Sequence, residues 1–146
     1  MFNVGFDLSV LFLVSFLAAT IFPAQSEIVL GGLYLTGKIN ALLLLLVATV
    51  GNVLGSCVNW VLGRFIRRFQ GRKWFPVGEK TLNRATKIYQ KYGIWSLLFA
   101  WVPFIGDPLT IVAGMLRVNI YVFFTLVAIG KCARYGVVLY ALGYRF

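Results

Sequence analysis

The sequence predicts an all-α integral membrane protein made of two inverted repeats, each a re-entrant helical hairpin followed by a spanning helix. Three observations favour this fold. The 146 residues are 60% hydrophobic and only 12% charged, whereas an ordinary soluble domain is about 25% charged. Four long apolar stretches follow one another, and proline breaks two of them near the middle. Both broken stretches carry a Pro-x-x-x-acid motif, so we expect one membrane domain with an internal duplication.

The first repeat, residues 8–63, begins with the apolar stretch 8–37, which Pro23 interrupts. A proline inside a lipid-exposed helix leaves backbone polar groups without partners. Arms of about 15 and 10 residues are too short to span but can reach the midplane and return. We therefore expect a hairpin, with a kinked full crossing as the alternative. Because no Lys or Arg precedes this stretch, we expect residues 1–26 to be retained rather than cleaved as a signal peptide.

The stretch 41–63 is long enough to cross a bilayer as one helix, because about 20 apolar residues suffice. It contains a GxxxG motif, and the small or polar residues continue at four-residue steps. Small residues on one face let helix backbones approach closely. We expect close helix packing here, and the motif leaves a homo-oligomer open. The packing residues are Gly51, Gly55, Asn59 and Gly63.

The linker 64–92 is strongly basic: nine of the 14 Lys and Arg residues fall between Arg64 and Lys91, against one acid, Glu79. The positive-inside rule places such a segment in the cytoplasm, where it also attracts anionic lipid headgroups. We expect these lipids, and not nucleic acid, as its partners. Within it, residues 79–92 have apolar side chains at helical spacing, which predicts an interfacial amphipathic helix. A solvated connector is the alternative.

The second repeat, residues 94–143, has the same order of segments. Its first stretch, 94–116, is broken at Pro103, Gly106 and Pro108, and a spanning helix is predicted at 119–143. A hairpin crosses the membrane zero times and a spanning helix once, so the second repeat starts on the opposite side from the first. The repeats are therefore predicted to be inverted, with both chain termini outside.

Four charged residues lie in the apolar regions. Glu27 and Asp107 follow the two breaks, and Lys131 and Arg134 lie in the last helix, three residues apart and hence on one face. Ionisable groups at membrane depth are costly and by default indicate a transport pathway. We expect Glu27 and Asp107 to be proton-linked transport residues, and Lys131, Arg134 and also Arg64 to supply phosphate binding or counter-charge. Ion pairs that only fix helix register are the alternative.

The sequence resembles the DedA, or VTT-domain, family, and particularly its short YqaA-like branch. The motifs that carry this resemblance are PxxxE at 23–27, GNVLGSCVNWVLGR at 51–64 and FAWVPFIGDPLTIVAG at 99–114. The resemblance implies two opposed re-entrant hairpins in the bacterial inner membrane. It also implies movement of lipids between leaflets, including undecaprenyl phosphate carriers, with proton coupling. Longer family members have arginine where this chain has Trp101 and Asp107.

These inferences favour a lipid flippase or scramblase that moves a phospholipid or a lipid phosphate carrier. Two alternatives stay open: a proton-coupled transporter of a small solute or ion, and a structural or assembly partner that docks a protein on its basic cytoplasmic surface. An enzyme is not expected, because the chain has no histidine and no recognisable catalytic motif. With only two cysteines, no metal site, cofactor or disulfide framework is predicted.

Overall fold

The computed structural model describes residues 3–20, 25–65, 78–102 and 104–146, and within these ranges it is all-helical. Pro23, Pro103 and the basic segment 66–77 lie outside the described residues. The long helices are α3 (Ala41–Arg64) and α7 (Ile120–Ala141). The shorter elements are α1 (Val4–Ala18), α2 (Gln25–Leu35), α5 (Glu79–Tyr92), the 3-10 helix η1 (Gly93–Trp101) and α6 (Gly106–Met115).

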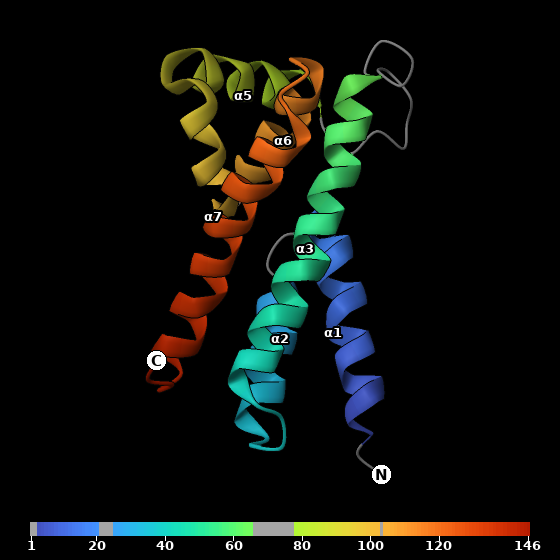
Figure 1. The fold of residues 1–146 in the computed structure, drawn as a ribbon, viewed down its shortest axis with the longest axis vertical. Coiled ribbons are helices and arrows are strands. Elements are labelled where there is room, and N and C mark those ends of the chain that lie inside the picture. The colour runs from blue at the N-terminus through green and yellow to red at the C-terminus, as the bar shows by residue number, and fades with distance from the viewer. Residues whose placement is uncertain (1–2, 21–24, 66–77, 103) are drawn as a thin grey trace.

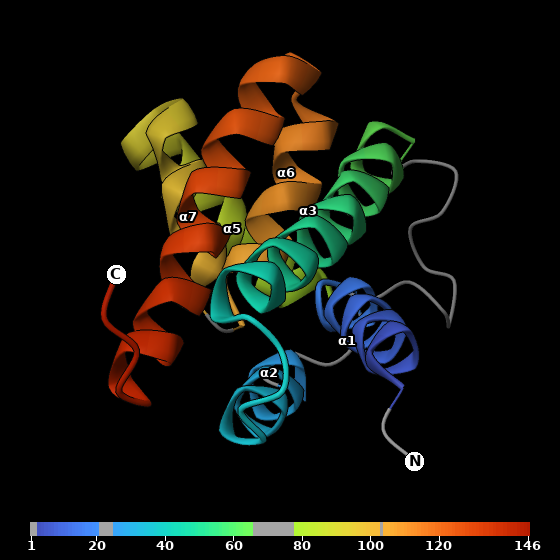
Figure 2. The same cartoon turned by 60° about the horizontal axis from the view of Figure 1, so that its bottom comes forward.

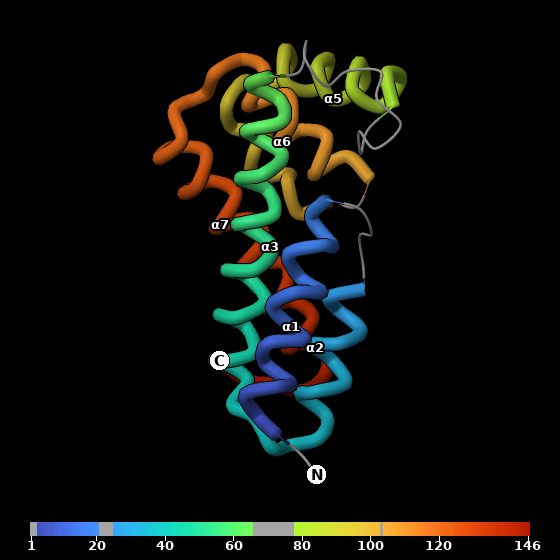
Figure 3. The backbone as a smooth tube through the Cα atoms, turned by 90° about the vertical axis from the view of Figure 1, so that its right-hand side faces the viewer, coloured from blue at the N-terminus to red at the C-terminus, as the bar shows by residue number. Residues whose placement is uncertain are grey.

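The helices form two hairpins at opposite ends of an elongated molecule (Figure 1). Helix α1 runs from the N-terminal end to mid-length, and α2 returns to the same end. Helix α3 then runs the full length, and α5 lies across the far end. From there η1 descends to mid-length, α6 climbs back, and α7 returns along the molecule antiparallel to α3. Figure 3 shows the same order from the side.

Only α3 and α7 are long and apolar enough to cross a membrane, among the described residues. Their 24 and 22 residues correspond to about 36 and 33 Å at about 1.5 Å per residue, against a hydrocarbon core of about 30 Å. The arms α1, α2 and α6 have 15, 11 and 10 residues and are each too short to span. Large apolar side chains cover the outside of both long helices, as a lipid-facing surface requires.

Both long helices begin at an asparagine cap. The Leu42 backbone N–H donates to Asn40 Oδ1 over 2.8 Å, and the Tyr121 N–H donates to Asn119 Oδ1 over 2.9 Å. An N-cap side chain satisfies one of the donors left free in the first helical turn. The sequence intervals 41–63 and 119–143 therefore correspond closely to the observed helices, each of which starts just after its cap.

Helix α3 is the centre of the packing and contacts α1, α2, α6 and α7 (Figure 2). Its glycines make this possible. A Cβ added to Gly51 or Gly55 would meet a backbone carbonyl of α1 at 2.6 or 2.4 Å, and one added to Gly63 would meet the Ile111 carbonyl of α6 at 1.9 Å. The glycine face is thus occupied by hairpins of the same chain. A homo-oligomer would need another surface.

Helix α5 has the bounds expected from its apolar spacing, but its apolar stripe faces protein. Leu82 and Ala85 are buried, and they cluster with Leu109, Ile111 and Val112 of α6. Tyr92, which the spacing also placed on the stripe, is exposed. The basic side chains lie on the opposite, solvent-accessible side. The stripe therefore packs against the second hairpin, and the interfacial position of the helix stays a prediction.

Candidate transport site

The two acids occupy equivalent places in the two hairpins. Glu27 lies in the first turn of α2, and Asp107 lies in the first turn of α6. Each is therefore at the N-terminus of the second arm of its hairpin, near mid-length of the molecule (Figure 1). The partial positive charge of a helix N-terminus favours a carboxylate at this position. Both arms thus present an acid to the region where the hairpin ends approach each other.

Asp107 forms an ion pair with Lys131 of α7, with 3.0 Å between the Lys131 Nζ and the Asp107 Oδ1. The lysine side chain is only 2% exposed, and that of the aspartate is 24% exposed. The Lys131 Nζ also donates to the Asn52 Oδ1 of α3. A buried ammonium is tolerated only when it is paired and hydrogen-bonded, and Lys131 has both kinds of partner.

Glu27 forms the second ion pair, with Arg134 of α7, through the Arg134 Nε and the Glu27 Oε1. These side chains are 25% and 16% exposed, so this pair is more accessible than the first. The two cations expected to compensate the two acids are therefore the ones that pair with them. One helix, α7, supplies the positive charge to both hairpins.

Buried polar side chains connect the two pairs. The Asn52 Nδ2 donates to the Tyr135 hydroxyl over 2.9 Å, and this hydroxyl lies 2.8 Å from the Ser26 Oγ. Tyr135 and Ser26 are not among the site residues predicted from the sequence. One signal was available, because Tyr135 follows Lys131 by four residues and so shares its helix face. Ser26 precedes Glu27, and no local pattern distinguishes it from other serines.

Asn59 ties both hairpins to α3. Its Nδ2 donates to the Ala19 carbonyl at the end of α1 over 2.8 Å and to the Thr110 Oγ1 of α6 over 3.1 Å. Asn59 is fully enclosed, so water does not compete for these bonds. The residue predicted to support helix packing therefore does so by hydrogen bonds as well as by its place on the glycine face.

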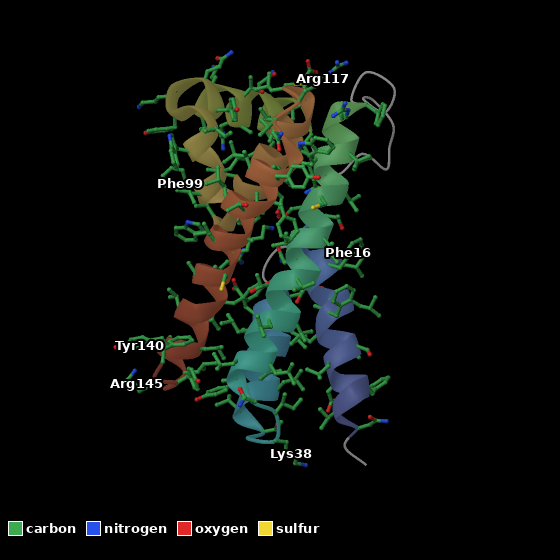
Figure 4. The ribbon with its side chains drawn as sticks, in the orientation of Figure 1. Phe16, Lys38, Phe99, Arg117, Tyr140 and Arg145 are labelled. Atoms are coloured by element: carbon green, nitrogen blue, oxygen red, sulfur yellow. The ribbon has the colours of Figure 1, made fainter. Side chains whose placement is uncertain are left out.

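Arg64 does not join this cluster. It is the last residue of α3, twelve residues beyond Asn52, which corresponds to about 18 Å along the helix. Its guanidinium lies over the Trp60 ring, with 5.3 Å between Cζ and the ring centroid. Figure 4 shows Arg117 at this same end of the molecule, with Lys38 and Arg145 at the other end. Arg64 is thus remote from the two acids, and its contact with lipid headgroups stays a prediction.

Of the residues predicted to break the second hairpin, the structure describes Gly106 and Pro108. Gly106 lies against α-carbon and carbonyl atoms of Ala100, because an added Cβ would meet the Ala100 carbonyl oxygen at 2.1 Å. Pro108 is buried in the first turn of α6, where a missing N–H costs no helical hydrogen bond. In the described part of the chain, no three His, Cys, Asp or Glu side chains are grouped to hold a metal ion.

Comparison with known proteins gives the family. The VTT domain matches residues 22–144, which include both acids, both cations and the bridge between them. The chain belongs to the VTT-domain family. Over 125 residues it is 37% identical to the inner membrane protein YqaA of Escherichia coli strain K12, covering 86% of this chain and 83% of that protein. This VTT-domain chain is therefore a membrane protein.

Two further relatives extend the comparison of the VTT domain. An uncharacterised protein of Haemophilus influenzae is 32% identical over 144 residues, covering 92% of this chain and 86% of that protein. A Staphylococcus aureus protein named undecaprenyl phosphate transporter A is 28% identical over 136 residues, covering 86% of this chain and 67% of that protein. No solved structure gives a significant match.

Proposed function

We propose that this protein is a transporter of the flippase or scramblase type that moves a lipid phosphate, of the undecaprenyl phosphate class or a phospholipid, between leaflets. The observation that carries the proposal is the pair of ion pairs on α7, at the level where two opposed hairpins end. Charged groups at this depth are costly and by default mark a pathway for a substrate, ion or proton. The printed name of the Staphylococcus aureus relative supports the choice of substrate class.

The proposal includes a membrane arrangement. Helices α3 and α7 span, while α1–α2 and η1–α6 are re-entrant hairpins that enter from opposite sides, so that the two halves are inverted repeats. The helix lengths and the antiparallel course of α3 and α7 support this arrangement. The end that carries α5 is cytoplasmic, because its basic residues satisfy the positive-inside rule. The membrane is the bacterial inner membrane, in keeping with the name of the Escherichia coli relative.

Topology is tested by labelling single cysteines at positions 3, 38, 78 and 117, after Cys57 and Cys132 have been replaced by alanine. Positions 3 and 38 should react from the periplasmic side, and positions 78 and 117 from the cytoplasmic side. Residues 3 and 38 on opposite sides would mean that the first hairpin is a full crossing and would remove the re-entrant arrangement.

In the proposed mechanism, the phosphate of the lipid and the carboxylates of the protein compete for the same cations. A phosphate and a carboxylate are both anions, and a guanidinium binds either through its planar array of donors. When Glu27 takes up a proton it no longer neutralises Arg134, and the guanidinium becomes free to hold a phosphate. The greater exposure of this pair makes it the first contact for a headgroup. Lys131 and Asp107 then provide a second, deeper position of the same kind.

The test is translocation of a labelled lipid phosphate in liposomes that contain the purified protein. Glu27→Gln and Asp107→Asn keep the shape of each side chain and fix it in the neutral state. The carboxylate can then no longer displace the phosphate from its cation, so each variant should lower the translocation rate by about tenfold or more, the range expected when a charged hydrogen-bonded partner is lost. Glu79→Gln, at the exposed start of α5, is the matched control and should leave the rate unchanged. Unchanged rates in both site variants would remove the two acids from the mechanism.

A second candidate is a proton-coupled transporter of a small ion or solute, and the near-complete burial of Lys131 favours it. A proton needs no lipid-sized opening to reach such a group. In the same liposomes, a pH-sensitive dye that reports proton movement without lipid translocation would select this candidate. Lipid movement would select the first.

A further inference from the structure

We propose that Asn52 and Tyr135 form a bridge that couples the two ion pairs, so that loss of charge at Asp107 in the second hairpin changes how the first hairpin docks on α7. The bridge connects side chains from four helices, all of them buried except the partly exposed Asp107. These are Asp107 of α6, Lys131 and Tyr135 of α7, Asn52 of α3 and Ser26 of α2. The coupling deepens the proposed transport function and rests on it for its biological purpose.

The hydrogen bonds form an unbroken sequence from one hairpin to the other. Asp107 accepts from the Lys131 Nζ, which also donates to the Oδ1 of the Asn52 side chain. The amide nitrogen of the same asparagine donates to the Tyr135 hydroxyl, which lies within hydrogen-bonding distance of Ser26. An amide with an acceptor at one end and a donor at the other transmits a change between its two partners. Within this series of hydrogen bonds, Asn52 is the side chain that contacts both Lys131 and Tyr135.

Burial keeps water away from the hydrogen bonds of the bridge. Asn52, Tyr135, Lys131 and Ser26 are all buried, so water does not readily replace a lost bond. Polar networks in such an environment are stabilising when every member is satisfied and costly when one is not. If Asp107 becomes neutral, the ammonium of Lys131 keeps Asn52 as its remaining described partner. The ammonium then moves toward the Asn52 Oδ1, and this movement shifts the amide whose Nδ2 donates to the Tyr135 hydroxyl.

The first hairpin docks on α7 through two adjacent contacts. Ser26 meets Tyr135 and Glu27 meets Arg134, so two successive residues of α2 contact two successive residues of α7. A shift in the Tyr135 hydroxyl therefore acts on the same helical turn that holds the accessible ion pair. The charged groups around the bridge are Asp107 from α6, Glu27 from α2 and Arg134 from α7, with the Cys57 thiol near Lys131 on α3.

The test measures the distance between α2 and α7 by double electron–electron resonance. Spin labels are attached to cysteines at positions 35 and 137, which are exposed on the two helices, with Cys57 and Cys132 replaced by alanine. Asp107→Asn should shift the mean distance by about 2 Å or more, the scale of interface helix movements. The same substitution in a Tyr135→Phe background should give no shift. An equal shift in both backgrounds, or no shift in either, would overturn the proposal.

Two controls separate coupling from damage. Ser26→Ala cuts the bridge at its other end without changing the aromatic ring, and it should abolish the Asp107→Asn response as Tyr135→Phe does. Tyr121→Phe, at an exposed position of the same helix, should leave the response intact. Loss of the response in Tyr121→Phe, or its persistence in Ser26→Ala, would contradict the assignment.

Translocation assays then distinguish the two proposals. Tyr135→Phe should slow lipid translocation about fivefold to tenfold, as expected for the loss of one buried hydrogen-bond group, while Tyr121→Phe keeps the wild-type rate. If the wild-type protein moves no lipid, the transport proposal fails and the resonance result still decides the coupling. If lipid moves at equal rates in Tyr135→Phe and wild type, the coupling has no part in transport and the bridge proposal fails.

Discussion

The two long helices have similar lengths and caps but carry different chemistry. Helix α3 contributes glycines and asparagines, which let the hairpin arms approach its backbone and then tie them to it. Helix α7 contributes Lys131 and Arg134, which pair with an acid from each hairpin. The molecule thus separates close packing from charge compensation. One long helix positions the hairpins, and the other neutralises the acids that they carry.

Pro23 and Pro103 are 80 residues apart, as are Glu27 and Asp107, and the same offset pairs positions of the two long helices. Gly51 and Gly55 of α3 correspond to Lys131 and Tyr135 of α7. In α3 these positions face the α1 backbone, where a Cβ would have no space. In α7 they carry two of the largest fully buried side chains, which fill the space between the halves and bridge it. At these positions α3 has glycines that permit close backbone contact, whereas α7 has long side chains that extend to neighbouring helices.

The first prediction tests the packing side of this comparison. Gly63→Ala places a Cβ 1.9 Å from the Ile111 carbonyl oxygen, and backbone atoms of two packed helices cannot move aside easily. We expect a loss of about 3 kcal/mol or more in the free energy of unfolding, at the upper end of the overpacking range. Unfolding in mixed micelles, followed by circular dichroism, measures it.

Gly136→Ala in α7 is the matched control for this packing prediction. Its Cβ would meet only the Phe146 ring, at 3.7 Å, so the stability should be unchanged or higher by up to about 1 kcal/mol from helix propensity. Equal losses in the two glycine variants would show that close packing is not concentrated on α3.

The second prediction tests the charge side. Lys131→Met leaves Asp107 in a largely enclosed site without its cation, and breaking a buried pair in this way costs about 3–5 kcal/mol. Arg134→Met breaks a pair whose cation is already 16% exposed, against 2% for Lys131, so we expect a smaller loss, about 1 kcal/mol. Chemical unfolding of both variants measures the difference.

Adding Asp107→Asn to Lys131→Met should recover part of the lost stability, because it removes the uncompensated charge. A double-mutant cycle for the Asp107–Lys131 pair should give a larger coupling energy than one for Glu27–Arg134. Equal coupling energies would mean that the two ion pairs are equivalent despite their different exposure.

The third prediction concerns the polar tie on α3. Asn59→Ala removes the bonds to the Ala19 carbonyl and to Thr110, which should cost about 1–2 kcal/mol at a buried site. At the equivalent position α7 has the buried apolar residue Leu139, so no such tie is expected there. Val58→Ala, at an exposed site on α3, is the control. A loss in Asn59→Ala no larger than in Val58→Ala would contradict the role.

The smallest expected effect concerns the aromatic residues at the ends of the two helices. Trp60 and Tyr140 are also 80 residues apart, and each has an arginine over its ring, at 5.3 and 4.6 Å. Only Trp60 also donates from its ring nitrogen, to the Val118 carbonyl over 3.1 Å. Trp60→Phe should therefore cost about 1 kcal/mol, and Tyr140→Phe close to nothing, by thermal unfolding. A larger loss in Tyr140→Phe than in Trp60→Phe would show that the hydrogen bond of the Trp60 ring does not set the difference between the two aromatic residues.

Much of the fold could be predicted because its signals are local. The ends of α5, the extents of the two long helices and the place of each acid just after a hairpin break all follow from hydropathy, caps and prolines within a few residues. The pairing of two acids with two bases could also be anticipated, because charge neutrality in an apolar interior leaves few alternatives. Tyr135 and Ser26 could not, since neither carries a charge or interrupts a pattern.

The sequence by itself determined that the chain is an α-helical membrane protein of the VTT-domain family, that a Pro-x-x-x-acid motif occurs in each half, and that four charges lie in its apolar segments. Only the tertiary structure decided that the glycine face of α3 packs against hairpins of the same chain, that α5 covers α6, and that Asn52 and Tyr135 connect the two ion pairs. The physical reason is the range of the interactions. Hydropathy and backbone conformation act within a segment, whereas a hydrogen-bond partner is chosen by the register of helices that are distant in sequence.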